Sequence, residues 1–294
     1  MIDKKLDFLC IGAQKSGTTS LHDILVQHPE IALPKNKETH FFSHEDIYTE
    51  DIEDYYKMFT SNLSSDKVIG EIDPEYLPSK LAYKRLYKNF GPNIKFIVIL
   101  RNPFDRAYSQ YLMSKRRGFE PLGFKESIEA EKGRINDQFS DLYHSYSTRS
   151  LYTPQIKKYL ELFDLSNFLF IRFEDDFLDN KSETIDRITT FLGLPPFNYN
   201  LNIESNRASV PKSKLVRDFV DKPGIIRKYG KHLVPFSGLR RSIINKIDHL
   251  NRKKISYAVN ESLKKELIEN LFLEDIKELE SLTKLNLSRW YKTM

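Results

Sequence analysis

Residues 6–21 read LDFLCIGAQKSGTTSL, and this stretch decides the fold. The apolar run 6–11 is short and interrupted only by Asp7, which is typical of a strand buried in a parallel sheet. The loop 12–17 contains two glycines and is followed by a helical pattern. A strand, a glycine loop and a helix in this order direct loop amides and the helix N-terminus toward one anion. The stretch therefore predicts a phosphate-binding loop.

Three further apolar runs predict strands, at 67–71, 94–100 and 168–173. Helical patterns lie between and after them, at 20–27, 79–89, 106–117, 153–163 and 184–192. This alternation favours an α/β fold of three layers, in which helices flank a central, mainly parallel sheet. A helical pattern returns at 256–285 and predicts a helical C-terminal extension.

The length of 294 residues lies near the upper limit for one hydrophobic core. Large apolar groups for that core are plentiful, with 20 Phe, 16 Tyr and 1 Trp, which excludes a disordered polar chain. We expect a single domain over 1–294. It would consist of an α/β core at 1–200, a basic segment of loops and short helices at 201–255, and a helical segment at 256–294.

Cysteine content and hydropathy indicate the compartment. Cys10 is the only cysteine, so the chain can form no internal disulfide and no cysteine-based zinc site. The first residues lack the apolar segment of a secretory signal, and no run approaches the about 20 apolar residues that span a bilayer. We therefore expect a cytoplasmic protein.

The predicted phosphate-binding loop differs from two common nucleotide motifs. Its glycine spacing, from Gly12 to Gly17, is that of a Walker A loop, but the lysine lies inside the loop at Lys15. A dinucleotide-binding loop would need G-x-G-x-x-G. The alternative is a tight turn whose glycines serve backbone geometry only, and such a turn would not need Lys15.

Several blocks in a fixed order resemble one enzyme family. The loop GAQKSGTT at 12–19 precedes PKNKETHFF at 34–42, FIVILRNPFDRAYSQY at 96–111, RSLY at 149–152 and a strand–helix–Pro-Pro segment at 168–196. Together they resemble the sulfotransferases that use 3′-phosphoadenosine-5′-phosphosulfate (PAPS), in particular the branch with heparan-sulfate and other carbohydrate O-sulfotransferases. The resemblance implies a P-loop-like fold, PAPS as the sulfuryl donor, 3′-phosphoadenosine-5′-phosphate (PAP) as product, and no required metal.

The resemblance also assigns residues to the donor. It places Arg101 and Ser109 on the 3′-phosphate, and Arg207 on a loop that closes over the nucleotide. It places five loop residues on the 5′-phosphosulfate: Lys15, Ser16, Gly17, Thr18 and Thr19. A lysine and helix-end amides there would stabilise the charge that develops on the leaving oxygen. The planar fork of an arginine suits phosphate, although Arg101 taken alone would equally suit a strand-end ion pair.

Glu38 and His40 complete the candidate catalytic set with Lys15. Glu38 matches the family's glutamate base, which takes the proton of the acceptor hydroxyl, and His40 matches a histidine beside that base. Taken alone, Glu38 would suit a surface loop and His40 a packed ring. The family segment E-K-[ST]-P-x-Y reads EIDPEY at 71–76 here, so the family's lysine is missing.

Basic residues are concentrated at 206–254. This segment has 14 Lys and Arg against 3 Asp, a net charge of 14 − 3 = +11, whereas the whole chain has +5. Clustered cations attract any anion, so the segment suits contact with a polyanion or with the periphery of a membrane, and it also suits a merely solvated surface. Nucleic acid is not expected, because no zinc-finger spacing, basic zipper or aromatic RNA-binding motif is present.

Three classes of function account for these patterns to different extents. A PAPS-dependent sulfotransferase that acts on a hydroxyl of a saccharide or glycoconjugate accounts for every block. A P-loop-type kinase that uses ATP and magnesium accounts only for the first loop and lacks a lysine after Gly17. A non-catalytic basic nucleotide-binding protein would not need Glu38.

Overall fold

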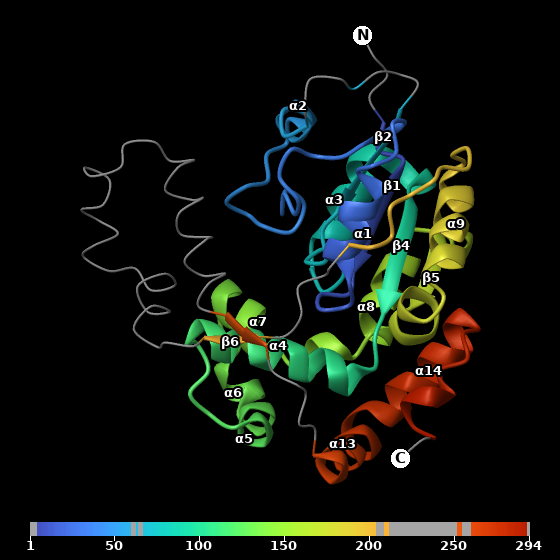
Figure 1. The fold of residues 1–294 in the computed structure, drawn as a ribbon. Coiled ribbons are helices and arrows are strands. Elements are labelled where there is room, and N and C mark those ends of the chain that lie inside the picture. The colour runs from blue at the N-terminus through green and yellow to red at the C-terminus, as the bar shows by residue number, and fades with distance from the viewer. Residues whose placement is uncertain are drawn as a thin grey trace. The chain divides into compact units, whose positions relative to one another are not determined.

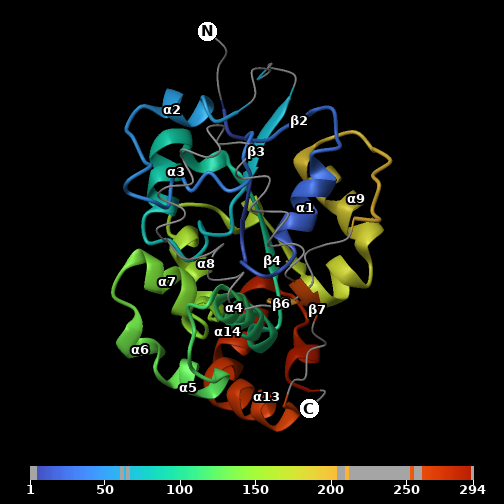
Figure 2. The same ribbon diagram turned by 60° about the vertical axis from the view of Figure 1, so that its left-hand side comes forward.

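The computed structural model describes residues 5–59, 63, 67–203, 209–211, 252–254 and 260–292. The chain forms two compact units: Met1–Arg106, Leu151–Ser205 and Lys265–Met294 in the first, and Ala107–Ser150 and Asn206–Lys264 in the second. Figures 1 and 2 show their helices and strands. The expected single domain over 1–294 stays a prediction.

A sheet of five strands forms the centre of the first unit (Figure 1). The strands are β1 (Phe8–Gly12), β2 (Ile31–Ala32), β3 (Val68–Ile72), β4 (Lys95–Leu100) and β5 (Phe168–Arg172). All pairs are parallel, and the order is β2-β3-β1-β4-β5. After β1 the chain forms β2 and β3 on one side of β1, and then β4 and β5 on its other side. The carboxyl end of β1 is thus a topological switch point, where ligands of such sheets bind.

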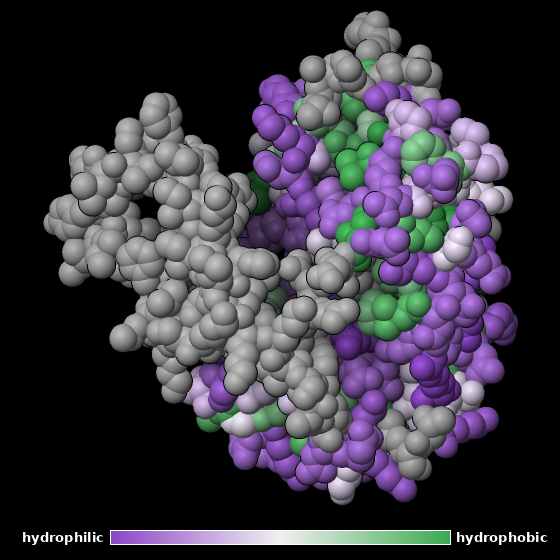
Figure 3. Space-filling view, in the orientation of Figure 1, coloured by the Kyte–Doolittle hydropathy of each residue, from purple (hydrophilic) through white to green (hydrophobic). Residues whose placement is uncertain are grey.

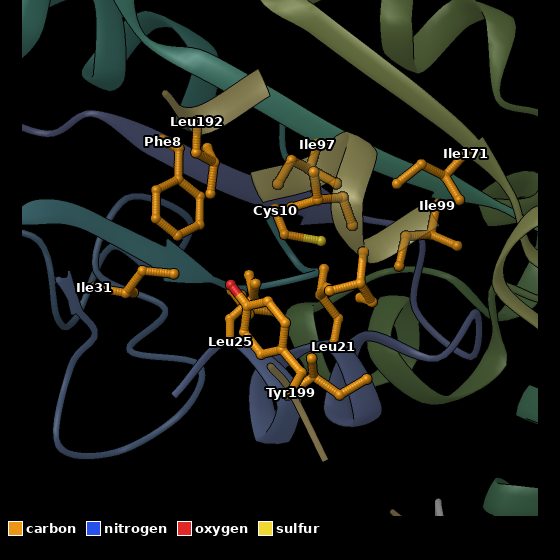
Figure 4. Close-up of a cluster of buried hydrophobic side chains, with 14 of the residues drawn as sticks. Phe8, Cys10, Leu21, Leu25, Ile31, Ile97, Ile99, Ile171, Leu192 and Tyr199 are labelled. Atoms are coloured by element: carbon orange, nitrogen blue, oxygen red, sulfur yellow. The ribbon is translucent and has the colours of Figure 1, made fainter. Parts of the chain in front are cut away.

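One face of this sheet packs against α1 (Thr18–Leu25) and α9 (Lys181–Leu192). In Figure 4, Leu21 of α1 lies close to Cys10 of β1 and near Ile97 and Ile99 of β4, and all four are fully buried. Leu192 joins the same cluster from α9. Burial raises the pKa of the Cys10 thiol to about 12, so this cysteine is a neutral core residue.

The other face packs against α3 (Ala82–Phe90) and α8 (Thr153–Leu160). The ring of Phe96 in β4 lies 5.4 Å from that of Tyr159 in α8, and Tyr159 lies 5.9 Å from Tyr83 in α3. Alternate residues of β4 thus face opposite helix layers, as the pleat of a strand requires. The predicted three-layer α/β fold with a parallel sheet is confirmed.

The other α-helices and strands complete the described chain. They are α2 (Ile52–Tyr56), α4 (Pro103–Arg117), α5 (Phe124–Glu129), α6 (Glu131–Arg134), α7 (Gln138–His144), an antiparallel pair β6 (Ser209–Pro211) and β7 (Arg252–Lys254), α13 (Glu261–Leu267) and α14 (Leu273–Thr283). Helices α13 and α14 confirm the predicted helical extension. Most of the basic segment 206–254 lies outside the described residues.

The C-terminal extension packs against the segments that follow β4 and β5. Asp275 of α14 accepts a hydrogen bond of 2.8 Å from the amide of Tyr152. Trp290 is buried, and its indole N–H donates to Glu174 at 3.2 Å. The side chain of Asn102 donates to the carbonyl of Trp290 at 3.3 Å. Residues 275–290 therefore support the chain just after the sheet strands end.

Hydrophilic residues cover most of the described surface on the face shown in Figure 3, with small hydrophobic areas between them. Within the ranges given above, none of the helices combines the length and the apolar character that a membrane crossing requires.

Gly70 in β3 is a position where the sheet tolerates no side chain. It lies opposite Phe8 in the β1–β3 register, and a Cβ there would come within 2.1 Å of the Phe8 ring. We expect Gly70→Ala to lower the free energy of unfolding by about 1–3 kcal/mol, because the ring must move within a close-packed core. Gly133→Ala is the control, since a Cβ there meets nothing within 4 Å. Urea unfolding followed by circular dichroism measures both, and an unchanged midpoint for Gly70→Ala would contradict this packing.

Candidate active site

The loop between β1 and α1 has the features of an anion site. Gly17, with a φ of +85°, precedes α1, and no side chain caps the first turn of that helix. The first amides of a helix have no acceptor within the helix, so they are available to a ligand. Ser16 is fully buried, and its Oγ bonds no described residue. A buried hydroxyl without a partner beside an uncapped helix N-terminus fits an anion such as phosphate.

Arg101 follows β4 and lies beside this loop. Its Nη1 donates to the carbonyl of Lys15 at 2.8 Å, and its guanidinium carbon is 5.0 Å from the centroid of the Phe173 ring. Its Nε is buried 4.0 Å from a carboxylate oxygen of Glu174 and has no hydrogen-bond partner among the described residues. Tyr152 donates to the Arg101 carbonyl at 2.9 Å. The guanidinium is thus held next to the loop with one N–H that another acceptor can take.

The other residues predicted to bind the donor differ in how far the structure places them. Thr18 and Thr19 form the first turn of α1, so their amides belong to the uncapped end. Ser109 lies on α4 within the second unit, where it is buried, and Arg207 lies outside the described residues. Contacts of Ser109 and Arg207 with a nucleotide stay predictions.

Glu38 and His40 lie in one backbone turn. Their φ values are 63° and 57°, a conformation that non-glycine residues keep only where the surroundings hold it. Glu38 forms an ion pair with Lys37, and its side chain is 33% exposed, so a ligand can reach the carboxylate. The ring of His40 stacks on that of His44, with 4.7 Å between the centroids.

Two fully buried carboxylates at the end of β3 hold this turn. Glu71 accepts a hydrogen bond of 2.8 Å from the amide of Thr39, and Asp73 accepts one of 2.7 Å from the amide of His40. In the sequence, the segment 71–76 indicated only that the family's lysine is missing. The roles of Glu71 and Asp73 in holding the turn were not predicted. The available signal was a pair of acidic residues at the carboxyl end of a predicted strand.

Both acids perturb the groups around them. The Glu71 carboxylate also accepts from the hydroxyls of Tyr55 and Tyr76, at 2.9 and 3.0 Å. Burial, together with the negative charge of Asp73, raises the pKa of Glu71 to about 7. Burial disfavours a charged His40 ring, but the hydrogen bond and the charge of Asp73 outweigh it and raise the pKa of His40 to about 9. His40 is therefore protonated at neutral pH.

A hydrogen-bonded path joins the 12–17 loop to the 38–40 turn. Gln14 in the loop donates to the carboxylate of Glu75 at 2.9 Å, and the amide of Glu75 donates to Asp73 at 3.0 Å. The amide of Asp73 donates to the carbonyl of Cys10 in β1 at 3.0 Å, and its carboxylate binds His40. The loop and the turn are therefore parts of one site at the carboxyl ends of β1 and β3.

Sequence comparisons connect this site with known enzymes. A family model described as a sulfotransferase domain matches residues 5–224. The membrane-associated sulfotransferase kil1 of Dictyostelium discoideum is 38% identical over 124 residues, 40% of this chain and 26% of that protein. The human heparan sulfate glucosamine 3-O-sulfotransferase 6 is 30% identical over 191 residues, 63% of this chain and 52% of that protein. The matched region thus spans 26% and 52% of these two relatives.

The fold comparison covers more of the chain. The crystal structure of a sulfotransferase from Alicyclobacillus acidocaldarius has a TM-score of 0.71 and 27% sequence identity, over 98% of this chain and 99% of that chain. The similarity therefore extends beyond the region that the family model matches.

Proposed function

The chain belongs to the sulfotransferase family, and on that premise we propose that it transfers the sulfuryl group of PAPS to a hydroxyl of a saccharide or glycoconjugate, with Glu38 as the base. Family membership makes the chain an enzyme of sulfuryl transfer, which counts against both a P-loop-type kinase and a non-catalytic binding protein. The saccharide acceptor is supported by the human relative, whose name specifies heparan sulfate glucosamine.

The phosphate-binding loop carries the proposal. The buried Ser16 hydroxyl and the uncapped start of α1 fit the 5′-phosphosulfate, and Lys15 lies in the same loop. The buried Nε of Arg101 supplies a further donor next to this loop, which suits the 3′-phosphate. PAPS would supply the sulfuryl group at this place, and PAP would be the product.

The reaction needs a proton acceptor and a stabilised leaving oxygen. The acceptor oxygen would attack sulfur and form the new S–O bond, its proton would pass to the Glu38 carboxylate, and the bond from sulfur to the phosphate oxygen would break. Lys15 would stabilise the charge that develops on that oxygen. Because His40 is already protonated at neutral pH, it would assist as a donor, which favours Glu38 over His40 as the base.

Calorimetric titration with PAP, AMP, ADP and ATP tests the donor. We expect PAP to bind more tightly than AMP, ADP or ATP, and Arg101→Lys to weaken PAP binding by about 10- to 100-fold, because lysine keeps the charge but loses the planar fork. AMP binding should change little. Arg187→Lys is the control, since that side chain is 42% exposed and pairs only weakly, at 3.9 Å from Asp176. A preference for ATP with magnesium over PAP would contradict the proposal and favour a kinase.

A further inference from the structure

We propose that Asp73 is a positioning residue for the reaction: it orients His40 and keeps its ring an imidazolium, so that the Nε2 N–H is a fixed cationic donor to the sulfuryl oxygens beside Glu38. The inference rests on the proposed function, because that function puts the reacting sulfur near Glu38.

The buried carboxylate of Asp73 lies beside one cation. The side chain is 0% exposed and receives hydrogen bonds from the amides of His40 and Glu75, at 2.7 and 3.0 Å. An ionised carboxylate buried without a cation is strongly destabilised. Among the described residues, the cation that forms an ion pair with Asp73 is His40.

The geometry of the His40 ring separates its two nitrogens. Nδ1 lies 3.0 and 3.2 Å from the two carboxylate oxygens of Asp73, whereas no described residue forms a hydrogen bond with Nε2. The side chain is 28% exposed, so a ligand can reach the ring. A carboxylate on one ring nitrogen fixes the orientation of the other. Asp73 therefore determines where the second N–H points.

The charges around His40 favour the protonated ring. Glu38 and Glu75 act on it in addition to Asp73, and together they overcome the effect of burial. The ring of His44 stacks on His40 and disfavours a positive charge on His40 only when His44 is itself protonated. Since the pKa of His40 is about 9, the ring loses its proton only as the pH rises through that value. Without Asp73, the hydrogen bond and the charge that oppose burial most strongly are lost, so the pKa of His40 falls.

The charge state of His40 can be measured without any assay of activity. In protein labelled with ¹⁵N-histidine, the ring signals of His40 are identified by their loss in His40→Gln. We expect His40 to titrate near pH 9 in the wild type. We expect Asp73→Asn to move this titration to a clearly lower pH. Asp46→Asn, an exposed change in the neighbouring loop, should leave the titration unchanged.

Turnover should follow the same titration. With ³⁵S-labelled PAPS and a heparan oligosaccharide, kcat of the wild type should fall above pH 9. A lower pKa leaves fewer His40 rings protonated at pH 7.5, so Asp73→Asn should lower kcat there by about 10-fold and recover most of it at pH 6. PAP affinity should be retained. In the His40→Gln background, Asp73→Asn should have no further effect on kcat.

Several results would overturn the inference. These are a wild-type His40 that titrates near 6.5 while PAP binds, an unchanged titration in Asp73→Asn, or losses in kcat that multiply in the double variant. If Asp73→Asn does not fold, two measurements still test the inference. They are the titration of His40 in the wild type and the loss, in His40→Gln, of the fall in kcat above pH 9. A His40 that titrates near 9 in a protein that binds no PAP would overturn the proposed function and, with it, the role of His40 toward sulfuryl oxygens.

Discussion

Replacing Glu38 with glutamine is expected to lower kcat by about 10²- to 10⁴-fold and to leave PAP affinity unchanged. Glutamine has the size of glutamate and can form hydrogen bonds, but it cannot take the proton of the acceptor hydroxyl. The native side chain is 33% exposed and pairs with Lys37 instead of filling the core, so the fold should tolerate the change. Turnover of a heparan oligosaccharide with ³⁵S-labelled PAPS gives kcat, and calorimetry gives the affinity.

The control for this variant is Glu45→Gln, the same substitution on an exposed carboxylate a few residues further along the chain. Its kcat should stay within about twofold of the wild type. If Glu38→Gln kept more than about a tenth of the wild-type kcat, the base would have to lie elsewhere in the site.

Replacing Lys15 with methionine is expected to lower kcat by about 10²- to 10³-fold, which is the usual effect of removing one donor from a developing negative charge. PAPS affinity should fall less than kcat, because the leaving oxygen gains its charge only in the transition state. Lys15 has a φ of 73°, and lysine and methionine both have a Cβ, so the substitution leaves the backbone cost the same. Steady-state turnover gives kcat, and rapid-quench measurement of one turnover separates the chemical step from donor binding.

Lys35→Met removes a charge from an exposed position and serves as the matched control. It should leave both kcat and PAPS affinity near the wild-type values. Full turnover by Lys15→Met would assign the stabilisation of the leaving oxygen to other groups, such as the amides of the first turn of α1.

The longer strands were predictable from the sequence. The apolar runs 94–100 and 168–173 appear as β4 (Lys95–Leu100) and β5 (Phe168–Arg172), because a short apolar run between polar segments suits a buried strand. β2 was not predicted, since Ile31 and Ala32 are too few to form a pattern and are a strand only through their pairing with β3. Helix α1 begins at Thr18, two residues before the predicted start. The prediction missed this start because Gly17 has no side chain that could signal a helix cap.

The site was predictable only where a local motif encodes it. The loop 12–19 and the blocks around Glu38 and Arg101 indicated a sulfotransferase, and the family is confirmed, whereas the individual roles stay predictions. The support of Glu38 and His40 was not predicted, because it joins His40 to Asp73 across 33 residues of sequence. A carboxylate that acts by accepting hydrogen bonds from a distant segment leaves no spacing pattern in the sequence.

The bond from Trp290 to Glu174 spans 116 residues and sets an order of events during synthesis. At about 5–20 residues per second, a ribosome adds these residues in roughly 6–23 s. Throughout that interval Arg101, Asn102 and Glu174 have been made, but the tryptophan that packs against the last two has not. The segments that follow β4 and β5 therefore stay incompletely packed until residue 290 has been made.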